Sequence, residues 1–290
     1  MLTTGQVLIS IKESTRLKIH EMATTAIAEK HLSPSAAGTL AAKGRFGYNL
    51  GPLGRAALRS LYSRQYSKCS PELHPIRDAV VLRDLRLMAD LYKVNPPSVI
   101  FQLTPPSLPP TVIFSDASFS GIVRPPYYGV GRIATIVRLP LSTSEFEYFY
   151  ISEIVPQSIL ARIYKLRKQS QFIFTLETLA TTMAYFCPQL QKRLMGRDIL
   201  HFGDNTGNNG AVIKGYSPAP DTDMLVGNLH LRLRRLAARF WLHYVPSKAN
   251  PADLPTRVDM ESQIDWKRFT DTYSPTRLSF VCTSLAHWTG

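Results

Sequence analysis

A proline-rich segment divides this sequence into two parts that cannot belong to one continuous regular element. Six prolines fall between residues 95 and 110. Proline lacks a backbone N–H and breaks a helix interior, so this stretch predicts an extended linker. Residues 1–95 have helical periodicity, whereas residues 111–257 are rich in runs of β-branched and aromatic residues. We expect a helical region over residues 1–95, a linker over 96–110 and a separate domain from residue 111.

The part after the linker predicts a mixed α/β domain. Three strand-like runs come first, "TVIFSDAS", "YGVGRIATIVRL" and "EFEYFYISEIV". Helix-like and strand-like stretches then alternate through "TLETLATTMAYF", "DILHFGD", "DMLVGNLHLRLRRLAARF" and "FWLHYVP". The expected order is β-β-β-α-β-α-β, which gives a five-stranded sheet with flanking helices, and Trp241 is expected in its core. Residues 258–290 carry no motif and are expected to form a C-terminal tail.

The charge of the chain favours a polyanionic partner. Lys and Arg total 34 against 21 Asp and Glu, which gives a net charge of +13 and a pI near 9.8. Such a basic surface most often binds nucleic acid, although a generally basic proteome is the alternative. Three widely spaced cysteines make no disulfide framework and fit the cytoplasm or nucleus. No apolar run reaches the length of a membrane span, and residues 1–10 lack a secretory signal pattern.

Four acidic residues occupy positions that predict a metal site. Asp116 interrupts the apolar strand "TVIFSDAS", where a carboxylate is costly unless it is paired or bound to a metal, although capping of a turn is the alternative. Glu177 lies in a helix after the sheet, Asp204 ends a strand, and Asp253 follows the last strand. If the strands are neighbours, their ends bring these carboxylates together. Their mutual repulsion then requires cations, and magnesium is the usual choice.

Four blocks of the sequence resemble those of a retroelement ribonuclease H domain. They are "VIFSDAS", "TLETLA", "LHFGDNTGNNGAVIKG" and "HYVPSKANPADLPTR", and the resemblance covers about residues 111–257. It implies the ribonuclease H fold, with an Asp-Glu-Asp-Asp site made by Asp116, Glu177, Asp204 and Asp253. It also implies two Mg²⁺ ions, with Mn²⁺ as a substitute. The implied reaction is cleavage of the RNA strand of an RNA–DNA hybrid.

The N-terminal region carries a second resemblance. The stretch "LSPSAAGTLAAKGRFGYNLGPLGRAALRSL" is similar to the segment after the polymerase palm in reverse transcriptases of DIRS-like and gypsy-like retroelements. In that family the segment forms thumb and connection. The sequence contains no Asp-Asp pair, so the usual polymerase signature is missing. We interpret the chain as the downstream part of a reverse transcriptase, with the polymerase part of the same element as a candidate partner.

Four further residues are candidates for contact with nucleic acid. Asn205 follows Asp204 and either forms a hydrogen bond near the metal site or caps the next helix. Lys248 lies in the loop where many family members carry a histidine. Arg257 either contacts a phosphate or pairs with a site carboxylate, and Arg235 lies on a helix flank that is otherwise a solvated face.

Two other functions compete with the nuclease. The chain could be a fragment that has lost catalysis and only binds nucleic acid, which the four intact carboxylates argue against. It could instead be an integrase-like or transposase-like nuclease, which shares the fold but normally carries three acids in a different spacing. The block "NPADLPTR" disfavours this second alternative.

Overall fold

The computed structural model describes residues 6–9, 11–48, 55–66, 76, 79–93, 99–102, 107–166 and 172–280. The chain divides into two compact units. The first consists of Met1–Pro105 with Lys214–Asp223, and the second consists of Pro106–Ile213 with Met224–Gly290. Across the described residues, no helix is both long and apolar enough to cross a membrane.

The first unit is helical, as the sequence predicted for the N-terminal region. Its helices are α1 (Glu13–Glu29), α2 (Pro34–Tyr48), α3 (Arg55–Gln65) and α4 (Ala79–Lys93). The Ser33 hydroxyl accepts a hydrogen bond from the Ala36 N–H, so Ser33 caps α2 ahead of the proline. A strand from the predicted linker, β2 (Val99–Gln102), pairs antiparallel with β1 (Gln6–Ile9). Residues 96–98 and 103–106 of that linker lie outside the described residues.

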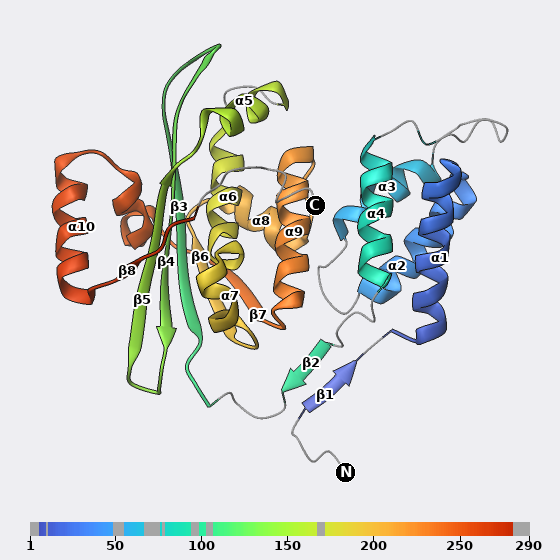
Figure 1. Ribbon diagram of the computed structural model, residues 1–290, viewed down its shortest axis with the longest axis horizontal. Helices are drawn as coiled ribbons and strands as arrows, with labels where there is room; N and C mark the ends of the chain where they lie inside the picture. The colour runs from blue at the N-terminus through green and yellow to red at the C-terminus, as the bar shows by residue number, and fades with distance from the viewer. Residues whose placement is uncertain are drawn as a thin grey trace. The chain divides into compact units, whose positions relative to one another are not determined.

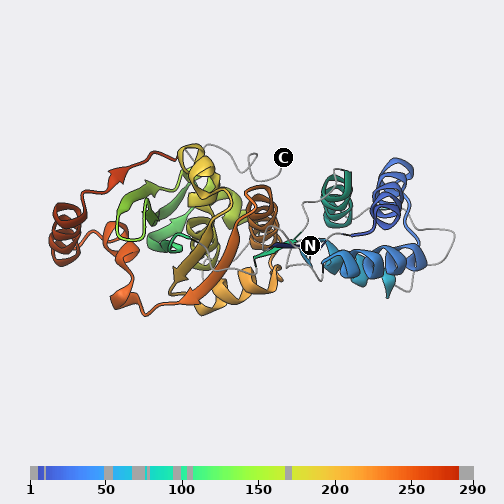
Figure 2. The same cartoon turned by 90° about the horizontal axis from the view of Figure 1, so that it is seen from below.

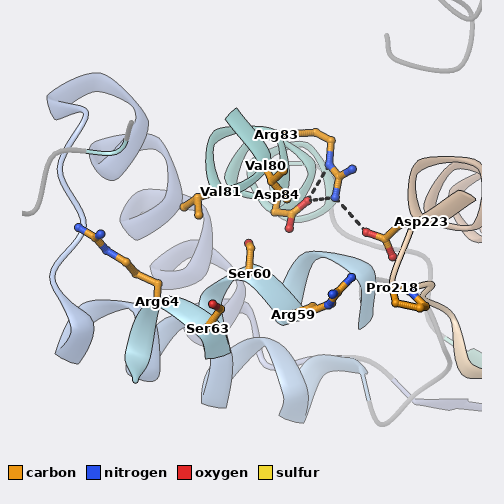
Figure 3. Close-up of a pocket in the computed structure, with 10 residues that line it drawn as sticks. All are labelled: Arg59, Ser60, Ser63, Arg64, Val80, Val81, Arg83, Asp84, Pro218 and Asp223. Carbon is orange, nitrogen blue, oxygen red and sulfur yellow. Dashed lines mark hydrogen bonds and ion pairs between the residues drawn. The ribbon is translucent and has the colours of Figure 1, made fainter. Parts of the chain in front are cut away.

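A pocket of about 380 Å³ lies beside α3 and α4 in this unit. Figure 3 shows how its charged side chains pair. The Arg83 guanidinium contacts the Asp84 carboxylate at 2.6 Å and the Asp223 carboxylate at 3.0 Å. Burial raises the pKa of both carboxyls, and the charge of Arg83 opposes that rise. Asp223 belongs to the segment Lys214–Asp223 of the first unit, so both ion pairs of Arg83 form within this unit.

The second unit is built on a six-stranded mixed sheet. Its strands are β3 (Thr111–Arg124), β4 (Tyr127–Pro140), β5 (Phe146–Ile154), β6 (Asp198–Gly203), β7 (Arg239–Tyr244) and β8 (Thr276–Arg277), in the order β7-β6-β3-β4-β5-β8. Strands β3, β4 and β5 run antiparallel, while β6 is parallel to β3 and β7 is parallel to β6. The predicted α/β sheet with flanking helices is confirmed. The sequence predicted five strands, because the two-residue strand β8 is too short to leave a periodic pattern.

Helices cover both faces of this sheet. They are α5 (Gln157–Leu166), α6 (Phe172–Phe186), α7 (Pro188–Leu194), α8 (Thr206–Lys214), α9 (Pro220–Arg235) and α10 (Met260–Tyr273). Figures 1 and 2 show α6 and α10 on opposite sides of the strands. The core lies between α6 and the sheet, where Ile113, Ile133, Phe172 and Leu176 are fully buried. Such burial is the main source of the unit's stability.

Helix α10 and strand β8, which follow residue 257, pack against the far side and the edge of the sheet. The ring of Trp266 on α10 lies 5.0 Å from that of Tyr150, and the ring of Tyr273 lies 4.8 Å from that of Tyr148. Strand β8 then pairs parallel with β5. The expectation that Trp241 lies in the core is wrong, since it is 47% exposed on the edge strand β7.

Candidate metal centre

The sheet register brings two of the predicted carboxylates side by side. Strands β3 and β6 are parallel, and their last paired residues are Ser115 and Gly203. Asp116 and Asp204 each come directly after this pair, one inside the longer strand and one at the end of the shorter. Neighbouring positions on adjacent strands lie about 5 Å apart. The register therefore places these two acids on neighbouring strands one residue beyond the last pair, with Asp204 just after the end of β6 and Asp116 inside a strand that continues to Arg124.

The third carboxylate comes from the helix packed on these strands. The Thr181 hydroxyl, one turn after Glu177 on α6, donates to the Glu177 carbonyl and lies 3.3 Å from the Ser115 hydroxyl on β3. Asp116, Glu177 and Asp204 each offer one oxygen, and these oxygens all lie within 4.8 Å of one another. One cation could contact all three.

The fourth predicted carboxylate lies beside this cluster but is engaged elsewhere. Asp253 sits in the short 3₁₀ helix η3 (Pro251–Thr256), and its Oδ1 accepts from Arg257 Nε at 2.8 Å. Of the two roles that the sequence left open for Arg257, the structure therefore shows pairing with a site carboxylate. The charge of Asp253 still reaches the cluster, since it helps to raise the pKa of Asp116 and of Glu177.

The cluster combines several acidic side chains with strong burial, and both raise the pKa values of its members. Burial raises the pKa of Asp116 to about 7, and the charges of Asp204 and Asp253 add to this rise. Burial likewise raises the pKa of Glu177 to about 9, with further contributions from Asp116, Asp204 and Asp253. These carboxylates cannot all be charged at neutral pH unless cations compensate them. The centre therefore takes up protons or binds metal.

Hydrogen-bond donors fix one oxygen on each aspartate. The Thr256 hydroxyl donates to Asp116 Oδ2 at 2.6 Å, and the Ser247 hydroxyl donates to Asp204 Oδ2 at 2.6 Å. No local sequence pattern marks either hydroxyl as a ligand-orienting group, although both lie in the block "HYVPSKANPADLPTR" that contains Asp253. Asp204 Oδ1 is buried and has no hydrogen-bond partner, so it is available to a ligand. An all-oxygen donor set of this kind fits Mg²⁺ or Mn²⁺.

The segment that carries Asp253 and Thr256 is tied to the strand that carries Asp116. Asn250 donates its side-chain N–H to the Ser115 carbonyl at 3.0 Å and caps η3 by accepting from Ala252. The Ser118 hydroxyl donates to the Thr256 carbonyl at 2.8 Å. These contacts fix η3 over β3, so the Thr256 hydroxyl is held in position against the Asp116 carboxylate.

A buried histidine joins the same elements behind the cluster. His201 on β6 contacts the Ser115 hydroxyl through Nε2 and the Tyr185 hydroxyl through Nδ1, each at 2.8 Å. Burial lowers the pKa of His201 to about 3, so its ring stays neutral. A neutral ring has one donor and one acceptor nitrogen, and each finds a hydroxyl here. The network ties β3, β6 and α6 together next to Asp116.

The four predicted nucleic-acid contacts occupy different settings. Asn205 accepts from the Asn208 N–H at 3.0 Å and so caps α8, the alternative role left open above. Lys248 is exposed next to Ser247, and Arg235 is exposed at the end of α9. Arg257 is half exposed and ion-paired with Asp253. Contact of these residues with nucleic acid stays a prediction.

Comparison with protein-family models gave no match, and comparison with curated proteins gave none either. Among solved structures, one match is described as "Crystal structure of LC9-RNase H1, a type 1 RNase H with the type 2 active-site motif". The identity is 12%, the match covers 63% of this chain and 92% of that chain, and the TM-score is 0.34. This similarity is low, and no function is assigned from it.

Proposed function

We propose that the chain is a metal-dependent endonuclease that hydrolyses the RNA strand of an RNA–DNA hybrid. The observation that carries this proposal is the convergence of Asp116, Glu177 and Asp204 within 4.8 Å, with Asp253 beside them. This acidic centre lies in a chain of net charge +13. A nuclease needs both, because cations at the centre act on the phosphodiester and basic side chains bind the nucleic-acid backbone.

The residues of the centre divide into ligands and positioning groups. Asp116, Glu177 and Asp204 would hold Mg²⁺, with Asp253 as a fourth ligand, and Mn²⁺ fits the same oxygens. Two bound ions would supply a nucleophilic water and neutralise the charge that develops on the phosphate. Thr256 and Ser247 orient the Asp116 and Asp204 carboxylates through the hydrogen bonds described above.

The choice of an RNA–DNA hybrid as substrate rests on the four sequence blocks together with the charge. Contacts with 2′-hydroxyls across the shallow minor groove would select the RNA strand. Lys248 and Arg235 are exposed cations that can contact phosphates. Asn205 directly follows Asp204 in the sequence, and Arg257 forms an ion pair with Asp253. The wider role that we propose is the C-terminal part of a retroelement reverse transcriptase, with residues 1–95 as the thumb and connection region.

Cleavage of a labelled hybrid tests the proposal directly. We expect RNA-strand cutting that requires magnesium and is lost in Asp204→Asn, because Asp204 supplies the open oxygen of the centre. Asp265→Asn is the matched control, since it removes a carboxylate from the exposed side of α10. Tight hybrid binding without cutting in the unaltered protein would instead support the binding-only alternative. Cutting that survives in Asp204→Asn would contradict the assignment of the site.

A further inference from the structure

The strand that carries Asp116 continues well beyond the centre. Strand β3 runs on to Arg124, turns, and returns as β4 from Tyr127. Strand β6 pairs with β3 only as far as Ser115, and β5 pairs with β4 only from Arg132. In the described sheet, residues 119–131, here called the outer hairpin, therefore pair only with each other. Figure 1 shows this hairpin projecting beyond the other strands.

The outer hairpin is braced at its base. Gln157, the first residue of α5, donates its side-chain N–H to the Gly129 carbonyl at 2.7 Å and accepts from the Tyr128 N–H at 3.0 Å. The Tyr128 ring lies 5.3 Å from that of Tyr164 on α5, and the Phe119 ring lies 5.1 Å from that of Phe172 on α6. An isolated two-stranded hairpin is marginally stable in water. These contacts make the outer hairpin an ordered projection.

A bulge and a close backbone approach shape the hairpin. The register shifts between Ser120 and Val123, and such a bulge bends and twists its strand. Gly129 has φ of +76°, and a Cβ there would lie 2.7 Å from the Phe119 ring and from the Ser120 carbonyl. Only glycine fits this position without displacing the bracing ring. The bend is therefore built into the sequence.

The tip of the outer hairpin combines apolar and cationic side chains. Ile122 is 64% exposed and Tyr127 is 50% exposed, with Arg124 exposed between them. Arg162 and Lys165 are also exposed on α5, the helix that braces the hairpin. Residues 117–140 and 155–166 contain five Arg or Lys and no Asp or Glu. Exposed apolar groups on an ordered projection favour a contact surface, and unopposed positive charge favours a polyanion.

We propose that the outer hairpin is an arm that binds the hybrid duplex to one side of the cleavage site. The proposal rests on the proposed nuclease function, since the arm extends from the same strand as Asp116. In this arrangement Arg124 contacts a phosphate, while Ile122 and Tyr127 contact sugar and base surface. Eight residues of strand separate Asp116 from Arg124, which span at most about 26 Å, or about eight base-pair steps. The arm therefore gives the enzyme a preference for longer duplexes.

Steady-state cleavage of two hybrids tests the arm. One hybrid is long enough to reach the tip of the outer hairpin on whichever side of the cut the hairpin lies. The other hybrid extends only about four base pairs from the cut on each side. The arm variant carries Ile122→Ser, Arg124→Ser and Tyr127→Ser. Its control carries Ile264→Ser and Arg268→Ser, which remove an exposed apolar residue and an exposed cation from α10. KM, kcat and the salt dependence of kcat/KM are measured for each.

We expect the unaltered protein and the control to have a lower KM for the long hybrid than for the short one. In the arm variant this length preference disappears, KM for the long hybrid rises about tenfold, and kcat is unchanged. The salt slope for the long hybrid falls by about 0.9, because one phosphate contact is lost. Arg124→Ser alone gives the same change in slope and guards against a folding defect in the triple variant, since this side chain is exposed.

The outcomes separate the arm from the nuclease. If the unaltered protein cuts and the arm variants keep its length preference and salt slope, the outer hairpin is not a duplex-binding arm. The proposed nuclease function is then unaffected. An equal fall in kcat/KM on both hybrids in Arg124→Ser would also contradict the proposed arm, because the short hybrid does not reach the tip of the hairpin. If the unaltered protein neither cuts nor binds a hybrid, the nuclease proposal fails and the arm fails with it.

Discussion

The two units bury carboxylates in opposite ways. In the first unit, Asp84 is 1% exposed, and the Arg83 guanidinium lies between it and Asp223. In the second unit, Asp116 and Glu177 are 3% and 5% exposed and have the charges of Asp204 and Asp253 around them. Burial is the largest cause of a raised pKa at both places. The neighbours differ in sign, since a cation opposes the rise in one unit and further carboxylates add to it in the other.

This difference separates a structural arrangement from a functional one. In the cluster around Arg83, the guanidinium compensates the buried carboxylates, so this cluster needs no ligand once the unit has folded. The cluster around Asp116 lacks enough positive charge of its own, because Arg257 is engaged with Asp253. A buried group of unneutralised acids destabilises a fold and is expected where a ligand supplies the missing charge.

The largest expected effect is the pH dependence of the metal-free protein. The pKa of Glu177 rises from 4.5 to about 9, so the folded state holds a proton that the unfolded state has released. The free energy of unfolding contributed by this group is therefore fully present below pH 4.5 and is lost as the pH rises towards 9. We expect a total fall of more than about 4 kcal/mol once Asp116 is included. Urea unfolding in EDTA at a series of pH values measures this fall. Magnesium should restore most of the lost free energy of unfolding at high pH. A flat profile would contradict this.

The next effect comes from breaking the paired site. Arg83→Met leaves Asp84 and Asp223 buried without this cation, and we expect a loss of about 3–5 kcal/mol in the free energy of unfolding. Urea unfolding at neutral pH measures the loss. Arg86→Met is the matched control, since Arg86 is exposed on the same helix. Equal stability of the two variants would show that Arg83 does not compensate these carboxyls.

Unlike Arg83→Met, the substitution Glu177→Gln should not lower the free energy of unfolding of the metal-free protein above neutral pH. It removes one of the mutually repelling acids, so the metal-free protein should be at least as stable as the unaltered one above neutral pH. Because loss of a group that only orients a ligand costs about 10–100-fold, loss of a ligand itself should cost more than about 100-fold in magnesium-dependent cutting. Unfolding in EDTA and cleavage rates measure the two effects. A variant that loses stability in EDTA would indicate that Glu177 is a structural acid.

The smallest expected effect concerns the hydroxyl that orients Asp116. Thr256→Val removes the donor to Asp116 Oδ2, which raises the pKa of Asp116 further and frees its rotation. We expect magnesium affinity to fall about tenfold, measured by calorimetric titration. Thr256→Ser keeps a hydroxyl and should retain near-normal affinity. If valine and serine give the same affinity, the hydrogen bond has no role in metal binding.

Local sequence patterns were enough to predict the fold class and the positions of the candidate acids along the chain. Periodicity and turn residues are local signals, so three features could be predicted from them: the helical first region, the succession of strands and helices after the prolines, and the association of Asp116 and Asp204 with strand patterns. A strand of two residues carries no such signal, and β8 was missed for that reason.

The contacts of those acids depend on how the elements pack in the folded chain. Arg257 binds Asp253, Thr256 holds Asp116 and Ser247 holds Asp204 through contacts that depend on how η3 and the preceding loop pack over the strands. Trp241 is exposed because its strand lies at the sheet edge, which no local pattern specifies. The raised pKa values of Asp116 and Glu177 arise from burial and from charges far away in sequence. Periodicity reports which residues form an element, whereas packing between elements fixes the environment of each side chain.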